Sequence, residues 1–213
     1  MKKLLLSLIA VSALAFSTQA QTEKGNFMIG GNVQVSSDKQ DDADKANTNF
    51  TINPSVGYFI SNNFAVGTGI GYQFSKTHTT NVTGGNITAI DTRKNEAFVV
   101  SPFARYYKGA SEQFKFFGQL SVPMAFGNTK TGDADGNNYV KTNKYNSIGV
   151  ALSPGVAFFP GKKFGIEFSV EGISYNNYSV KDGNDNDIIG GGSKSFNLGA
   201  NFFNPNIGVQ FYF

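Results

Sequence analysis

Four segments of this 213-residue chain share one pattern, in which a polar residue and a proline are followed by alternating residues that end in aromatics. Their prolines, Pro54, Pro102, Pro154 and Pro205, are 48, 52 and 51 residues apart. Alternation with a period of two is typical of a β-strand, because successive side chains point to opposite faces. Similar strands at a regular spacing predict a closed antiparallel barrel.

The first three segments continue through a short polar stretch into a second alternating segment. These second segments begin at Phe64, Phe114 and Phe164, and a further alternating segment opens at Phe27. The pattern predicts four hairpin units and therefore eight strands. Proline cannot donate a hydrogen bond within a sheet, so we expect a bulge or widened pairing near each proline.

The remaining connections are long and polar. They cover residues 37–47, 79–95, 127–144 and 176–195. Three short turns that alternate with four long loops are typical of outer-membrane barrels, whose periplasmic turns are short and whose extracellular loops are long. We therefore predict an all-β fold, an eight-stranded antiparallel up-and-down transmembrane β-barrel with both termini on the periplasmic side.

The alternation itself is compatible with a soluble, lipocalin-like barrel, in which the apolar face points inward. The composition of the polar face favours the membrane: it carries uncharged residues such as Gly67, Gly71 and Gln73, where a soluble exterior would carry many Lys and Glu residues. Aromatics gather at the strand ends, for example Tyr58 and Tyr106. We expect them to form the aromatic girdle of a lipid-facing surface.

The first 20 residues have the pattern of a secretory signal peptide. Lys2 and Lys3 precede an apolar stretch, and small residues near Ala20 suit a signal peptidase. We predict cleavage after Ala20, which leaves residues 21–213 as one barrel domain. Without the two lysines the formal net charge falls from +3 to +1, so the chain lacks the basic field that nucleic-acid binding requires. Cysteine is absent from the sequence, which excludes disulfides and thiol chemistry.

The last residues carry a recognisable motif, which consists of Asn206, Gly208, Phe211 and Phe213. It resembles the assembly signal on the final strand of outer-membrane barrels. With the proline-containing hairpins, the chain resembles the small eight-stranded outer membrane protein beta-barrel domain family, which is similar to OmpX and to the transmembrane domain of OmpA. The resemblance implies the outer membrane of a Gram-negative bacterium as location. The partners it implies are the barrel assembly machinery and the surrounding lipid and lipopolysaccharide, and it implies no cofactor.

Four charged residues fall on the inward face by alternation, namely Arg105, Lys115, Glu167 and Glu171. The interior of an eight-stranded barrel is about wide enough for side chains to fill, so charges there must be paired. One interpretation is a narrow pore gated by a salt bridge, and the other is a closed, hydrogen-bonded plug. Glu167 and Glu171 are four residues apart and so share a face in a regular strand.

His78 is the only histidine, and alternation places it on the outward face near the outer end of its strand. Some eight-stranded outer-membrane barrels are lipid A-modifying enzymes that use a histidine. Here no serine nucleophile or orienting acid follows at a recognisable spacing, so we predict no enzymatic activity. The acidic segments 133–137 and 182–187 lack the late glutamate of a calcium loop, and no metal site is predicted.

The fold therefore predicts a location more closely than a function. We expect a structural or surface-interaction role, in envelope integrity, adhesion or recognition of an extracellular ligand through the four polar loops. Two alternatives stay open. One is a narrow channel for small solutes through the charged lumen, and the other is a lipid A-modifying enzyme that uses His78.

Overall fold

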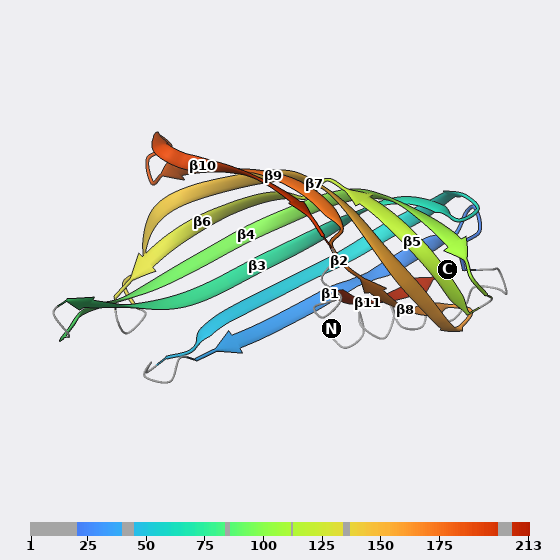
Figure 1. The fold of residues 1–213 in the computed structure, drawn as a ribbon, viewed down its shortest axis with the longest axis horizontal. Helices are drawn as coiled ribbons and strands as arrows, with labels where there is room; N and C mark the ends of the chain where they lie inside the picture. The colour runs from blue at the N-terminus through green and yellow to red at the C-terminus, as the bar shows by residue number, and fades with distance from the viewer. Residues whose placement is uncertain (1–20, 40–44, 84–85, 112, 134–136, 200–205) are drawn as a thin grey trace, which may run out of the picture.

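The computed structural model describes residues 21–39, 45–83, 86–111, 113–133, 137–199 and 206–213, and eleven β-strands account for most of them (Figure 1). The strands are β1 (Phe27–Asp38), β2 (Asn47–Ser61), β3 (Phe64–Thr83), β4 (Asn86–Gly109), β5 (Phe114–Ser121), β6 (Met124–Gly132), β7 (Val140–Gly161), β8 (Phe164–Ser169), β9 (Ile173–Asp182), β10 (Asp187–Leu198) and β11 (Asn206–Tyr212). No helix in these ranges is long and apolar enough to cross a membrane.

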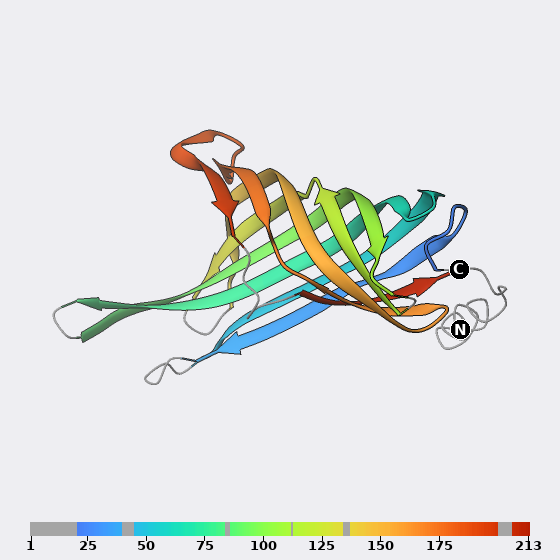
Figure 2. The same ribbon diagram turned by 45° about the vertical axis from the view of Figure 1, so that its right-hand side comes forward.

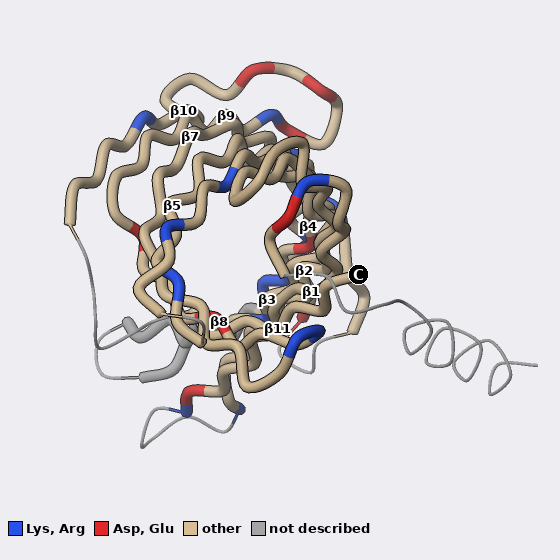
Figure 3. Tube along the Cα trace, turned by 90° about the vertical axis from the view of Figure 1, so that its right-hand side faces the viewer, with Lys and Arg blue, Asp and Glu red and all other residues tan. Residues whose placement is uncertain are grey.

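All strand pairs are antiparallel, and they close into a ring of eight strand positions. β5 and β6 both lie between β4 and β7, so they are two halves of one interrupted strand. β8 and β9 share the next position in the same way, and β10 and β11 pair with them. β11 then pairs with β1 and closes the barrel, which Figure 2 shows from the side and Figure 3 along its axis. The predicted eight-stranded antiparallel barrel is confirmed.

Irregularities in the neighbouring strand accommodate the prolines that the structure describes, whereas Pro205 lies outside the described residues. Pro102 lies beside the interruption between β5 and β6, where the backbone N–H of Val122 donates to the Pro102 carbonyl at 2.9 Å. Pro154 lies beside the interruption between β8 and β9, where the N–H of Val170 donates to its carbonyl at 3.1 Å. A strand that loses a proline N–H is thus paired with a strand that bends at the same place.

Opposite Pro54, the adjustment is made by a glycine. Gly31 has a φ of +144°, and a Cβ on it would lie 2.4 Å from the carbonyl oxygen of Asn53. Only a residue without a side chain fits between these two strands at this point.

Apolar side chains cover the outside of the barrel, as the alternation predicts. On β4, Phe98 and Tyr106 are about half exposed, whereas Phe103, Arg105 and Tyr107 point inward and are buried. A band of exposed Ile, Val, Leu and Phe residues around a closed sheet suits contact with lipid. At the end that carries the short turns, paired aromatics such as Phe27 and Tyr58, with ring centroids 4.9 Å apart, form the expected girdle.

The polar connections contain fewer residues than the sequence predicts, because the β-strands continue into the segments expected as loops. β3 and β4 pair as far as Thr83 and Asn86, within the segment expected as a loop at 79–95. β6 and β7 likewise continue into 127–144. These stretches are rich in threonine and other β-branched residues, which favour extended backbone even where they are polar.

Candidate functional site

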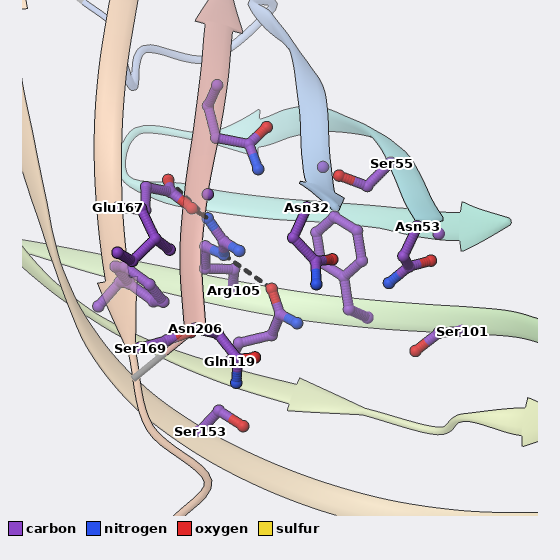
Figure 4. Close-up of a pocket in the computed structure, with 17 residues that line it drawn as sticks. Asn32, Asn53, Ser55, Ser101, Arg105, Gln119, Ser153, Glu167, Ser169 and Asn206 are labelled. Atoms are coloured by element: carbon purple, nitrogen blue, oxygen red, sulfur yellow. Dashed lines mark hydrogen bonds and ion pairs between the residues drawn. The ribbon is translucent and has the colours of Figure 1, made fainter. Parts of the chain in front are cut away.

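An ion pair crosses the interior of the barrel near the end that carries the short turns. Arg105 on β4 faces Glu167 on β8, and its Nη1 lies 2.8 Å from Oε1 and 2.7 Å from Oε2 of the glutamate (Figure 4). The exposed fractions of the two side chains are only 9% and 5%. A buried ion pair stabilises a protein only if the remaining hydrogen-bonding groups of both side chains also have partners, because both charges have been removed from water.

Neighbouring side chains supply those hydrogen bonds. The hydroxyls of Tyr107 and Tyr212 each donate to Oε1 of Glu167 at 3.0 Å. Arg105 donates from Nη1 to the Tyr107 hydroxyl at 2.9 Å and from Nε to Oε1 of Gln119 at 2.8 Å. The group formed by Arg105, Glu167, Tyr107, Tyr212 and Gln119, which we call the lumenal ion-pair network, therefore leaves neither charge without partners.

An apolar layer fills the barrel on the turn side of this network. Its buried residues are Met28, Phe59, Ala65, Phe117, Ala157 and Phe159, together with the rings of Tyr107 and Tyr212. Phe103 extends the same cluster to the cavity side of Arg105. The Phe59 and Tyr107 rings are 5.9 Å apart, and those of Phe159 and Tyr212 are 5.3 Å apart. Rings at these distances pack against one another, so apolar side chains occupy the lumen at this level.

The segment 21–26 covers the turn end of the barrel beneath the apolar layer. Thr22 is buried, and its hydroxyl donates to Oδ1 of Asn63 at 2.6 Å. Lys115 donates from Nζ to the Thr22 hydroxyl, and the side chain of Gln21 reaches across to the carbonyl of Gly161 at 2.9 Å. This segment, which we call the N-terminal cap, adds a polar layer beneath the apolar layer. Nothing in the apolar pattern of the sequence indicates the cap.

A polar cavity of about 270 Å³ lies on the other side of the ion pair. Arg105 and Glu167 border it, together with uncharged polar residues such as Asn32, Asn53 and Ser101 (Figure 4). A second cavity of about 230 Å³ shares Asn32 and Asn53 and is lined further on by residues such as Gln34 and Gln73. The described interior is therefore filled by apolar side chains toward the turns and contains polar cavities toward the other end.

Two buried acceptors in this polar part of the interior lack a partner among the described residues. They are Oδ1 of Asn53 and Oε1 of Gln210. A buried polar atom without a partner is costly, and ordered water is its usual partner where the cavity is polar and large enough. The cavity beside the ion pair meets both conditions.

The structure brings together only two of the four charges expected in the lumen. Arg105 and Glu167 meet, whereas Lys115 lies in the N-terminal cap. Glu171 lies in the interruption between β8 and β9 and is exposed, because the interruption shifts the alternation and turns Glu171 away from the face of Glu167. The hydrogen-bonding residues Tyr107, Tyr212 and Gln119 were not expected, although their inward parity in the alternation marks them as candidates.

His78 lies on β3 beyond the apolar band. Its Nδ1 is 3.1 Å from the hydroxyl of Thr92, and its backbone N–H donates to Oδ1 of Asn47 at 2.8 Å. Within the described ranges, no carboxylate or serine hydroxyl is hydrogen-bonded to the imidazole, and no group of three or more His, Cys, Asp or Glu residues is placed to hold a metal ion. The surroundings of His78 therefore do not resemble those of a catalytic histidine, which acts as a base hydrogen-bonded to a nucleophile.

The C-terminal motif forms the seam of the barrel. Asn206 and Gly208 face the polar cavity, and the ring of Phe211 faces outward, 5.5 Å from that of Phe164. The backbones of Phe213 and Phe27 exchange two hydrogen bonds of 2.9 and 3.0 Å. The last residues thus join the first strand to the last, while their role as an assembly signal stays a prediction.

A closed antiparallel barrel with an apolar exterior and a polar interior defines the class of transmembrane β-barrels. Residues 6–211 match the family described as the outer membrane protein beta-barrel domain. The chain belongs to this family, as its C-terminal motif and hairpins indicate.

Solved structures with a related fold come from several bacteria. The chain is similar to a major outer membrane protein of Thermus thermophilus, with a TM-score of 0.52, 10% identity, and coverage of 89% of this chain and 99% of that one. It also matches OprG of Pseudomonas aeruginosa, with a TM-score of 0.47, 15% identity, and coverage of 92% and 99%. A third similar structure is that of Ail of Yersinia pestis, with a TM-score of 0.42, 15% identity, and coverage of 89% of this chain and 99% of that one. These identities bear on the fold alone, and among curated proteins none matches the sequence.

Proposed function

We propose that this protein is a structural and surface-interaction barrel of the outer membrane, and that it acts through the part that projects beyond the lipid. The observation that carries this proposal is the length of the β3–β4 hairpin, whose strands have 20 and 24 residues. A transmembrane strand needs only about 9–11 residues. At roughly 3.3 Å per residue, β4 is about 80 Å long, so about half of the hairpin extends past the membrane.

A continuous ladder gives this projection a defined shape. The register between β3 and β4 runs with one irregularity from Phe64 and Tyr106 to Thr83 and Asn86, and the hairpin extends past the other strands in Figure 1. A paired ribbon gives the described part of the hairpin, as far as Thr83 and Asn86, a defined distance and direction from the barrel, which suits contact with a ligand outside the cell. The apolar layer and the N-terminal cap at the turn end support the same proposal, since a scaffold does not need a path through the membrane.

Shortening the hairpin tests the proposal. His78 and Thr92 are opposite each other in the register, so residues 79–91 can be replaced by an Asn-Gly turn without a change of register in the strands below. We expect the shortened barrel to fold, as judged by its heat-dependent shift on gels. Cells that produce it are expected to adhere less to immobilised fibronectin, heparin or mucin, or to survive bile salts less well. Equal behaviour of both proteins in all these assays would refute the proposal.

A narrow channel is the second candidate, and the polar cavity next to the ion pair is the observation that favours it. In this arrangement the lumenal ion-pair network would be the gate. Recordings in planar bilayers separate the two functions. A steady conductance that Glu167→Gln changes would support the channel, and a silent bilayer for both proteins would support the sealed scaffold.

The proposed location is the outer membrane of a Gram-negative bacterium, after removal of residues 1–20. The hydrogen bonds of Gln21 and Thr22 at the turn end support cleavage after Ala20, because the mature N-terminus then has a defined place. Mass spectrometry of the protein from outer-membrane fractions measures the cleavage site directly. A mature chain that begins elsewhere than Gln21 would contradict it.

A further inference from the structure

A row of lysines crosses four neighbouring strands on the outside of the barrel. Lys76 on β3 is directly opposite Lys94 on β4, Lys94 is opposite Lys130 on β6, and Lys130 is opposite Lys141 on β7. We call these four residues the lysine row. Lys144 on β7 is in turn opposite Lys181 on β9, so the positive charge continues along the same side.

The lysine row lies where the apolar exterior ends. The nearest outward aromatic residues on the membrane side of the row are Phe74, Phe98 and Phe126, and the last two are about half exposed. Glu96 and Asn128 are the outward residues between the row and Phe98 and Phe126. Nζ of Lys94 lies 5.3 Å from the centre of the Phe74 ring, so both side chains are on the outer face. The row therefore follows the boundary between the lipid-facing band and the projecting part of the strands.

The charges of the row are only partly compensated. Like charges directly opposite each other in a sheet are destabilising. The carboxylate of Glu96 lies 2.5 Å from Lys94 and 2.7 Å from Lys130 and so serves the two central lysines together. Among the described residues, neither Lys76 nor Lys141 forms an ion pair within 4 Å. Asp185, which is paired with Lys144, acts on Lys141 only from a longer distance, so the two ends of the row are compensated less than its centre.

The neighbouring pair of lysines is partly neutralised by exposed acids. Lys144 forms an ion pair with Asp185, and Lys181 lies 3.5 Å from Asp187. Six lysines thus face four carboxylates among the described residues on this side of the barrel, namely Glu96, Asp182, Asp185 and Asp187. The excess positive charge remains next to the membrane surface.

We propose that the lysine row binds phosphate groups of lipids in the outer leaflet. Lysine can keep its alkyl stem along an apolar surface and extend its ammonium into the head-group layer, where phosphate oxygens accept strong hydrogen bonds. Three steps between strands span roughly 14 Å, which is wide enough for separate anions at Lys76 and Lys141. The inference rests on the outer-membrane location and goes beyond the proposed function, because it does not depend on the tip of the hairpin.

The test compares two double variants of the detergent-folded barrel. Lys76→Gln/Lys141→Gln removes the charges at the two ends of the row, which form no direct ion pair among the described residues. Lys162→Gln/Lys163→Gln removes the same charge from the turn between β7 and β8, at the opposite end of the barrel. Binding of purified lipopolysaccharide, of the same material after enzymatic dephosphorylation, and of inorganic phosphate is measured for each protein, and heat-dependent gel shifts verify that each is folded.

A lysine near a charged membrane surface contributes roughly a fivefold change in affinity. We therefore expect the row variant to bind lipopolysaccharide at least about tenfold more weakly than the wild type, and the turn variant to bind it normally. Dephosphorylation should weaken binding to the wild type, and inorganic phosphate should compete only poorly. Equal affinity of the row variant and the wild type would overturn the proposal, as would undiminished binding of the dephosphorylated material. Full competition by inorganic phosphate would show a site for free anions instead of lipid.

Discussion

Arg105 and Glu167 are 62 residues apart in the sequence, yet Nη1 of the arginine lies within 2.8 Å of both oxygens of the glutamate. β4 and β8 are not hydrogen-bonded to each other in the sheet, so the pair links them across the interior of the barrel. It therefore fixes the barrel in cross-section, and its hydrogen bonds to Tyr107 and Tyr212 extend this link to the last strand.

Glu167→Gln should destabilise the barrel strongly, because it leaves the arginine charge buried without a counter-charge. The expected loss is about 3–5 kcal/mol in the free energy of unfolding. Urea unfolding in lipid vesicles measures it. The double variant Arg105→Met/Glu167→Leu removes both charges and should cost less than Glu167→Gln alone, so a larger loss in the double variant would contradict this account.

Thr22→Val should open the N-terminal cap without a change in the shape of the residue. Lys115 would lose the shorter of its two hydrogen bonds and keep only the one to Oδ1 of Asn63 at 3.4 Å, and Val cannot bond to Asn63. Since a hydrogen bond to a charged group contributes roughly 1.5 kcal/mol or more, we expect an amine-reactive reagent to label Lys115 about tenfold faster. Lys162 in the exposed turn serves as the internal control, and an unchanged ratio of the two labelling rates would disprove the prediction.

Gly155→Ala should disturb the apolar layer. A Cβ at this position would lie 2.3 Å from the ring carbon Cζ of Phe117 and 2.6 Å from the carbonyl oxygen of Phe168, and the latter is backbone that cannot easily move. The expected destabilisation is about 1–3 kcal/mol, measured by urea unfolding. Gly109→Ala is the matched control, because no atom lies within 4 Å of its added Cβ. Similar losses for both variants would show that packing at Gly155 is not the cause.

Deletion of Phe213 should lower insertion into the outer membrane and leave export across the inner membrane intact. The deletion removes both backbone hydrogen bonds to Phe27 and the terminal aromatic that resembles the signal read by the barrel assembly machinery. The amounts of protein in outer-membrane and periplasmic fractions measure the two steps separately. Phe213→Tyr keeps an aromatic end and should insert normally, whereas normal insertion of the deletion would remove the claim.

The architecture was readable from the sequence because each strand carries its own alternation and the proline pattern repeats. The position of Arg105 and Glu167 on the inward face follows from the same alternation. Their contact does not, since alternation places a side chain inside the barrel without assigning its height or its partner. Tyr107 and Tyr212 went unrecognised for this reason, although both have inward parity.

Two kinds of feature could not be predicted from periodicity. The N-terminal cap has no repeat, and hydrogen bonds across the barrel hold Thr22 in place. The interruption at 170–172 adds a residue to one strand, and a single added residue reverses the face of everything that follows it. The position of Glu171 differs from the expectation because the alternation was extended through this interruption.

The same interruption changes which residues face outward along one strand position of the barrel. In β8 the even-numbered residues, such as Phe168, face the lipid, whereas in β9 the odd-numbered residues, such as Ile173 and Tyr175, do so. Tolerance to charged substitution should therefore switch phase within three residues, with Glu167 and Ser174 on the sheltered side and their neighbours on the other. An alignment or a design of this barrel must count the extra residue of the interruption at 170–172. If that residue is left out, the residues of β9 that face the lumen are assigned to the lipid surface, and those that face the lipid are assigned to the lumen.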